Sequence, residues 1–167
     1  KSPLGTIGID RYRLYLMAIY TGLRASELAS LKRGSFDWEA NTITVHAGYT
    51  KNGQTAILPI HPVIATELKS WIDELPQDAK LWKGTWAKKK RGADMLKKDL
   101  QEAKISFELD GKRFDFHALR TQFITGLVKS GAKPKDAQTL ARHSSFVITG
   151  SNVGFANGFR FHILHSR

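Results

Sequence analysis

The sequence predicts an α+β domain that is mainly α-helical and carries a small antiparallel β-sheet or hairpin. Apolar residues repeat at helical spacing over residues 9–20, 62–75 and 116–129. Two segments rich in β-branched residues, 42–45 and 55–60, flank an Asn-Gly pair, and this combination is typical of a hairpin. The 167 residues, 41% of them hydrophobic, are enough for one domain with its own core.

The first helix is expected to end at Thr21-Gly22, where glycine interrupts the apolar repeat. A short helix then restarts over residues 25–31, with Leu28 and Leu31 facing the core. Arg24 is then expected just after this break, near the start of the short helix.

In the hairpin that follows, Asn52-Gly53 supplies the turn, so Lys51 is expected at its tip. The helix over residues 62–75 is amphipathic and packs its apolar face on the core. The helix over residues 116–129 is expected to stop at Gly131.

A basic stretch runs from residue 80 to residue 104, with Trp82 and Trp86 interleaved. One interpretation is a solvated helix face, because acidic residues partly balance its second half. The first half contains four consecutive cations without that balance, and we predict that they contact DNA phosphates. These four are Lys88, Lys89, Lys90 and Arg91.

The remainder of the chain divides near residue 145. Pro134 is expected to open a short helix that reaches residue 141. Residues 146–167 have no acidic residue and no helical or strand periodicity. We therefore expect one domain over residues 1–145 and an aberrant or truncated segment over residues 146–167.

Composition narrows the class of protein. Lysine and arginine exceed aspartate and glutamate by 11, which points to a polyanion partner such as nucleic acid, although an inert basic surface is the alternative. The absence of cysteine excludes disulfides and thiolate zinc sites. No apolar run reaches the roughly 18 residues of a membrane span, and we expect a soluble, cytoplasmic protein.

Basic side chains in four separated segments form a candidate site. An arginine fork matches the oxygens of a phosphate, and a lysine adds charge and a transferable proton. Two arginines, one lysine and two histidines are what phosphodiester transfer without a metal would need. The segments are TGLRASEL with Arg24, TKNG with Lys51, HALR with His117 and Arg120, and ARHSS with His143.

Two of these segments have further local features. His117 and Arg120 are three residues apart, which places both on one face of a helix's first turn. Glu27, three residues after Arg24, either orients the guanidinium or supports the short helix. Each segment alone is weak evidence, whereas their occurrence together and in this order is strongly specific.

The four segments resemble the catalytic domain of the tyrosine recombinase (phage integrase) family, from about residue 9 to residue 145. The resemblance implies that family's fold and its site-specific DNA recombination and integration. It implies that Arg24 and Arg120 neutralise the scissile phosphate while His117 and His143 donate hydrogen bonds. Lys51 would protonate the departing 5′ oxygen while a tyrosine forms a 3′-phosphotyrosyl link.

The resemblance also implies the setting in which the protein acts. The partner is double-stranded DNA, full-length homologues assemble on it as a homotetramer, and no metal or other cofactor takes part. The protein would be nucleoid-associated and of prokaryotic or phage origin.

Two departures from the family pattern matter. The helical DNA-clamping domain that precedes the catalytic domain in the family has no counterpart, so we expect a fragment or an excised domain. No tyrosine follows His143, and Asn152 and Val153 stand about nine to ten residues beyond it. The four tyrosines resemble core or strand residues and are Tyr12, Tyr15, Tyr20 and Tyr49.

We therefore expect this chain alone to form no covalent link to DNA. Three hypotheses stay open at this point. The chain is the catalytic domain of an integrase with an altered end, a non-enzymatic DNA-binding relic, or an enzyme related to type IB topoisomerases.

Overall fold

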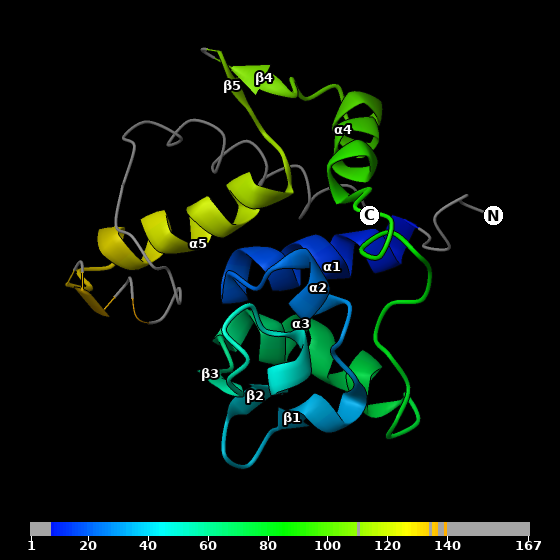
Figure 1. Ribbon diagram of the computed structural model, residues 1–167, viewed down its shortest axis with the longest axis vertical. Helices are drawn as coiled ribbons and strands as arrows, with labels where there is room; N and C mark the ends of the chain where they lie inside the picture. Colours follow the sequence, from blue (N-terminus) through cyan, green and yellow to red (C-terminus); the bar gives the residue numbers. More distant parts are fainter. Residues whose placement is uncertain (1–7, 110, 134, 137–138, 140–167) are drawn as a thin grey trace.

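The computed structural model describes residues 8–109, 111–133, 135–136 and 139. It is rich in helices and contains a small antiparallel sheet, which confirms the predicted α+β class (Figure 1). The long first helix runs through the middle of the molecule. The sheet and α3 lie on one side of it, and α4 and α5 lie on the other (Figure 1).

The first two helices are α1 (Gly8–Thr21) and α2 (Ala25–Leu28). Helix α2 is shorter than the predicted 25–31, because the amides of Ser30 and Leu31 bond the carbonyls three residues earlier. These bonds form a tight turn in place of a further α-helical turn. Leu28 and Leu31 are nevertheless buried, as predicted.

The sheet has three antiparallel strands in the order β1-β2-β3. Ile43 in β2 pairs with Leu58 in β3, and both side chains are buried on the core face. The sequence did not predict β1, which is only two residues long. The elements are η1 (Arg33–Ser35), β1 (Phe36–Asp37), β2 (Thr42–Val45), η2 (Ala47–Tyr49) and β3 (Ala56–Pro59).

After the sheet, the described chain contains helices α3, α4 and α5, with turns before α4 and one small hairpin before α5. Residues 81–91 form turns, so the basic stretch becomes helical only from Gly92 onward. Helix α5 has the predicted bounds, and Gly131 follows it with φ +92°. The elements are α3 (Pro62–Asp73), α4 (Gly92–Glu102), β4 (Glu108–Leu109), β5 (Lys112–Arg113) and α5 (Phe116–Lys129). The short helix predicted from Pro134 and the segment 146–167 lie largely or wholly outside the described residues.

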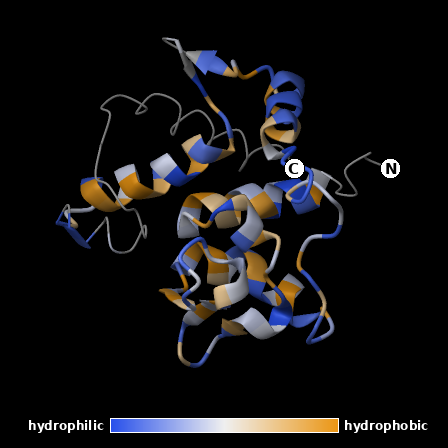
Figure 2. Ribbon diagram, in the orientation of Figure 1, coloured by the Kyte–Doolittle hydropathy of each residue, from blue (hydrophilic) through white to orange (hydrophobic). Residues whose placement is uncertain are grey.

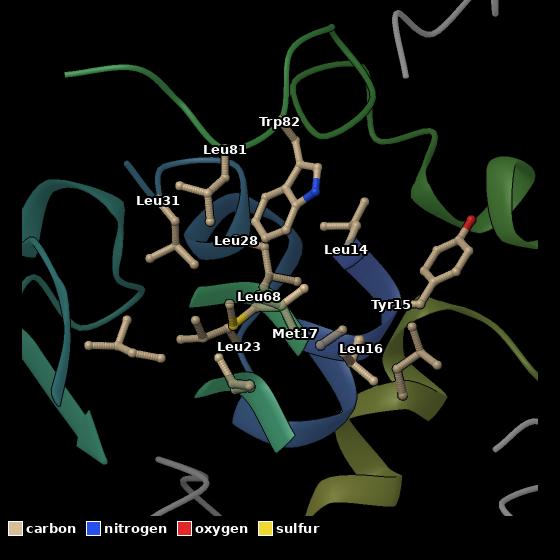
Figure 3. Close-up of a cluster of buried hydrophobic side chains, with 14 of the residues drawn as sticks. Leu14, Tyr15, Leu16, Met17, Leu23, Leu28, Leu31, Leu68, Leu81 and Trp82 are labelled. Carbon is tan, nitrogen blue, oxygen red and sulfur yellow. The ribbon is translucent and has the colours of Figure 1, made fainter. Parts of the chain in front are cut away.

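One apolar core joins these elements, and its residues concentrate where α1, α3 and the sheet meet (Figure 2). Leu81 and Trp82, from the turns before α4, belong to the same cluster as Leu28 and Leu31 (Figure 3). Trp82 and Trp86 are both buried, so the aromatic residues of the basic stretch are anchors in the core. Tyr49 is 49% exposed, so the prediction that all four tyrosines are core or strand residues is wrong for it.

Candidate phosphate-binding site

Arg24 lies in the break between α1 and α2. Gly22 ends α1 with φ +61°, its amide bonding the carbonyl of Ala18 at 3.0 Å. Arg24 is extended and immediately precedes α2, and its side chain is 32% exposed. The guanidinium is therefore available at the surface while its backbone is held at a helix start.

The carboxylate of Glu27 holds both the backbone and the side chain of Arg24. One carboxylate oxygen accepts the backbone N–H of Arg24 at 2.7 Å, and the other accepts its Nη1 at 3.2 Å. Glu27 is fully buried, and a buried carboxylate needs hydrogen-bond donors of this kind. Such a pair holds the arginine in one orientation, which a phosphate-binding group requires.

Arg120 comes from α5, far along the chain. Asp115 caps this helix by accepting the N–H groups of His117 and Ala118 at 2.9 and 3.0 Å. Arg120 follows one turn later, is only 4% exposed, and its Nη1 donates to the carbonyl of Gly22, 98 positions away in sequence. A buried arginine is unusual unless it is paired.

The hydrogen bond to Gly22 links Arg120 of α5 to the loop between α1 and α2. Gly22 is two residues before Arg24, so Arg120 contacts the same loop that carries Arg24. The ring of Phe123 closes over Gly22, and a Cβ there would lie 2.4 Å from Cδ1 of Phe123. Glycine is needed at this position for its backbone conformation and for the close approach of α5.

The other predicted site residues differ in how far the structure connects them. His117 is exposed and lies three residues before Arg120 at the start of α5. Lys51 is exposed in the connection between β2 and β3, and in the described part of the chain no hydrogen bond or ion pair joins it to the arginines. His143 lies outside the described residues.

The predicted DNA-contacting run forms an exposed turn before α4. Lys88, Lys89 and Lys90 have no ion pair to another described residue, whereas Arg91 Nε lies 3.1 Å from Asp94 Oδ2. The interpretation of a wholly unbalanced run is therefore wrong for Arg91. Both partners of that pair are exposed, so it contributes little to stability.

Sequence reasoning missed two contributors to this site. The capping role of Asp115 could have been predicted, because aspartate directly precedes the apolar repeat of α5. The hydrogen bond from Arg120 to the carbonyl of Gly22 could not have been predicted, because a backbone contact over 98 positions has no sequence signal.

Neither a metal centre nor a membrane span accompanies these cations in the part of the chain that the structure describes. Among the described residues, no three histidine, cysteine, aspartate or glutamate side chains gather as a metal site would need. None of the helices in the described ranges is long and apolar enough to cross a membrane.

The model of the phage integrase family matches residues 4–152. The chain belongs to this family. It is 29% identical over 140 residues to the tyrosine recombinase XerA of Pyrococcus furiosus, covering 83% of this chain and 48% of that protein. The XerA of Thermococcus onnurineus is 26% identical over 140 residues, with 83% of this chain and 49% of that protein covered. The chain thus spans about half the length of these relatives.

Solved structures of integrases share the fold. The integrase from mycobacterium phage Brujita superposes with a TM-score of 0.63 at 22% identity, covering 95% of this chain and 53% of that one. A crystal structure of XerA recombinase gives 0.63 at 20% identity, covering 100% and 67%. The Tn1549 transposon integrase in complex with transposon right-end DNA gives 0.62 at 19% identity, covering 92% and 59%. This chain therefore has the fold of a tyrosine recombinase catalytic domain.

Proposed function

We propose that residues 1–145 of this integrase-family chain are the catalytic domain of a site-specific recombinase that acts on double-stranded DNA. The reaction cleaves and rejoins strands through a 3′-phosphotyrosyl intermediate and uses no metal or other cofactor. A homotetramer assembled on DNA in a prokaryotic cytoplasm would carry it out. Family membership supports this, as does the shared fold with an integrase solved on transposon DNA.

One observation carries the site assignment: Arg120 donates to the loop that holds Arg24. Two guanidinium groups at one phosphate can neutralise its two non-bridging oxygens as negative charge builds up on them. Each preorganised donor of this kind is worth roughly 3–4 kcal/mol of barrier. The fixed pairing of Arg24 with buried Glu27 supports preorganisation.

The other predicted residues complete the step. Lys51 donates a proton to the 5′ oxygen as the phosphorus–oxygen bond breaks. The attacking tyrosine hydroxyl releases its proton to water, and its oxygen takes the place of the 5′ oxygen on phosphorus. His117 and His143 donate hydrogen bonds to the phosphate. A 5′ hydroxyl from another strand then reverses the reaction, releasing the tyrosine.

The first half of that reaction needs a tyrosine, and none follows Tyr49 in this sequence. We expect no covalent product when this chain is incubated with a suicide DNA substrate and analysed on a denaturing gel. A protein–DNA adduct that survives boiling would contradict this expectation, and mapping it would identify the replacement nucleophile.

The second half can be tested without a protein tyrosine. A strand ending in a 3′-(p-nitrophenyl phosphate), annealed beside a free 5′ hydroxyl, already carries an aryl ester, so joining needs only the phosphate-binding residues. A pool with randomised flanking sequence, read by sequencing the joined products, removes the need to know the target site. We expect joining above the protein-free level and its loss in Arg24→Ala.

A non-enzymatic DNA-binding protein is the second candidate, because the missing tyrosine and the exposed lysines suit it equally. It predicts DNA binding with no joining of the activated strand. The joining assay therefore separates the two proposals.

DNA binding itself is tested by fluorescence anisotropy across a salt series. We expect a Kd of about 10⁻⁴–10⁻⁶ M near physiological salt with little sequence preference. Replacing Lys88, Lys89 and Lys90 by alanine should flatten the salt slope by about one unit for each lysine that neutralises a phosphate in the wild-type complex.

The matched control replaces three lysines that already lie within 4.0 Å of a carboxylate: Lys32, Lys69 and Lys98. It removes the same charge and should change the slope less. Equal slopes for the two triple variants would show that residues 88–90 form only a solvated surface.

A further inference from the structure

The basic residues 88–90 lie on a turn that has no regular secondary structure of its own. The amide of Lys89 bonds the carbonyl of Thr85 at 2.9 Å, and that of Arg91 bonds the carbonyl of Trp86 at 2.8 Å. Lys90 has φ +53°, a left-handed conformation that a lysine adopts only when its surroundings hold it there. We call residues 85–91 the basic turn.

The basic turn is attached to the core by an aromatic contact. Trp86, 1% exposed, packs its ring 5.5 Å from that of Phe116, centroid to centroid. Phe116 also meets the ring of Tyr15 edge-on, with the ring centroids 6.1 Å apart. The exit of the turn contacts the same side chain, since a Cβ at Gly92 would lie 3.2 Å from Cδ2 of Phe116.

Phe116 is also the first residue of α5, directly before His117 and one turn before Arg120. The Phe116 side chain thus contacts Trp86, near the start of the basic turn, and Gly92, directly after its end. Phe116 also begins the helix that carries the candidate phosphate ligands. If the ring of Phe116 moves, the lysines move relative to the arginines, because close-packed side chains transmit a displacement to their neighbours.

We propose that Phe116 is a positioning residue that sets where the basic turn lies relative to the arginines, so that both engage one DNA duplex. This deepens the proposed function and rests on it. Two groups of cations that bind one ligand reinforce each other only when their separation matches the ligand. Phe116 itself touches no phosphate and acts through the basic turn.

Phe116→Leu removes the ring and keeps an apolar side chain. Its matched control is Phe36→Leu in β1. Phe36 is 9% exposed, and its ring stacks on that of Trp38 with the centroids 5.3 Å apart. Strand β1 lies on the opposite side of the molecule from α4 (Figure 1). Both variants replace a ring that packs against other aromatic rings, Trp86 and Tyr15 for Phe116 and Trp38 for Phe36. A general loss of packing would act alike in the two.

The first measurement is amide hydrogen exchange without DNA. In Phe116→Leu the amides of Lys89, Lys90 and Arg91 should exchange about tenfold or more faster, while the β2–β3 amides keep their protection. In Phe36→Leu the pattern should reverse. Unchanged exchange in the basic turn of Phe116→Leu would overturn the proposal, whatever DNA binding shows.

The second measurement is the salt dependence of DNA binding. Phe116→Leu should flatten the slope as the triple alanine variant of residues 88–90 does, and combining the two should flatten it no further. Phe36→Leu should retain the wild-type slope. Faster exchange with an unchanged slope would overturn the role toward DNA.

Gly92→Ala is a second variant that keeps the ring and pushes on it with one methyl group. It should give the same pattern with a smaller effect, and it serves if Phe116→Leu fails to fold. If the wild-type chain shows no salt-dependent DNA binding, the proposed function falls, while the exchange measurement still decides whether Phe116 sets the basic turn.

Discussion

Two glycine-containing turns carry cations of the candidate site, and they are built in opposite ways. Gly22 and Gly53 have nearly the same backbone conformation, with φ of +61° and +65°. Around Gly22 the chain is closed over by α5 through Arg120 and the ring of Phe123. Around Gly53, next to the exposed Lys51, a Cβ would meet nothing within 4 Å.

The difference between the two turns matches the chemistry proposed for the arginines and for Lys51. Groups that neutralise a developing charge work best when they are fixed before the substrate arrives, since no reorganisation is then needed. A proton donor on an exposed turn can instead adjust to the bound DNA. Arg24 and Arg120 belong to the fixed kind, and Lys51 to the adjustable kind.

The largest test exchanges the two glycines for alanine. Gly22→Ala should lower the free energy of unfolding by about 3–4 kcal/mol, because the new Cβ is strained at positive φ and collides with Phe123. Gly53→Ala should cost only the strain, about 1–2 kcal/mol. Urea denaturation measures both, and equal losses would contradict the comparison.

The next test removes the buried support of Arg24. Glu27→Ala should lower the free energy of unfolding by about 2–3 kcal/mol, because the Arg24 amide and guanidinium lose a buried acceptor. Ser26→Ala, an exposed neighbour on the same helix, is the control and should stay within about 0.5 kcal/mol of wild type. A Glu27→Ala variant as stable as the control would show that Arg24 is held by other contacts.

How much of this contrast was readable from the sequence differs between its two halves. Local signals were sufficient for the hairpin and for α5, because an Asn-Gly turn, an apolar repeat and a terminal glycine all act within a few residues. Residues 42–45 and 116–129 therefore form the predicted strand and helix.

The buried half depends on contacts that no local pattern encodes. HxxR spacing places Arg120 on a helix face, but it does not indicate that the carbonyl of Gly22, 98 positions away, accepts a hydrogen bond from its guanidinium. Trp86 looks like part of a basic, exposed stretch until Phe116 is found against it. Tertiary packing decides both, and the role of His143 stays a prediction because it lies outside the described residues.

A third test asks how far the buried half extends along α1. Tyr15 Oη lies 2.5 Å from Asp99 Oδ2 on α4, and Arg11 pairs with the same carboxylate. Tyr15→Phe should cost about 1–2 kcal/mol at neutral pH, because a hydrogen bond to a charged acceptor is removed. Guanidinium denaturation measures this cost, and Tyr49→Phe, on an exposed ring, is the control.

The contribution of Tyr15 to stability should also depend on pH. Burial, reinforced by the hydrogen bond to Asp99, raises the pKa of the Tyr15 hydroxyl well above its usual range. The unfolded chain releases this proton near pH 10, so the stabilisation is complete below about pH 10 and is lost as pH rises further. Stability should fall more steeply above that pH in wild type than in Tyr15→Phe, and parallel curves would contradict a proton held by folding.

The smallest effect is expected at the tip of the hairpin. Lys51→Ala should change the free energy of unfolding by less than about 0.5 kcal/mol, because the side chain is exposed and bonds no other described residue. Thr50→Ala is the matched control one position away. Its hydroxyl lies 3.0 Å from the carbonyl oxygen of Ala47 and 2.7 Å from that of Gln54, so removing it should open the turn and cost about 1 kcal/mol. Thermal unfolding of the two variants side by side measures the difference. A Lys51→Ala loss as large as that of Thr50→Ala would mean that the lysine helps to hold its own turn, and the adjustable half of the site would then be as fixed as the arginine half.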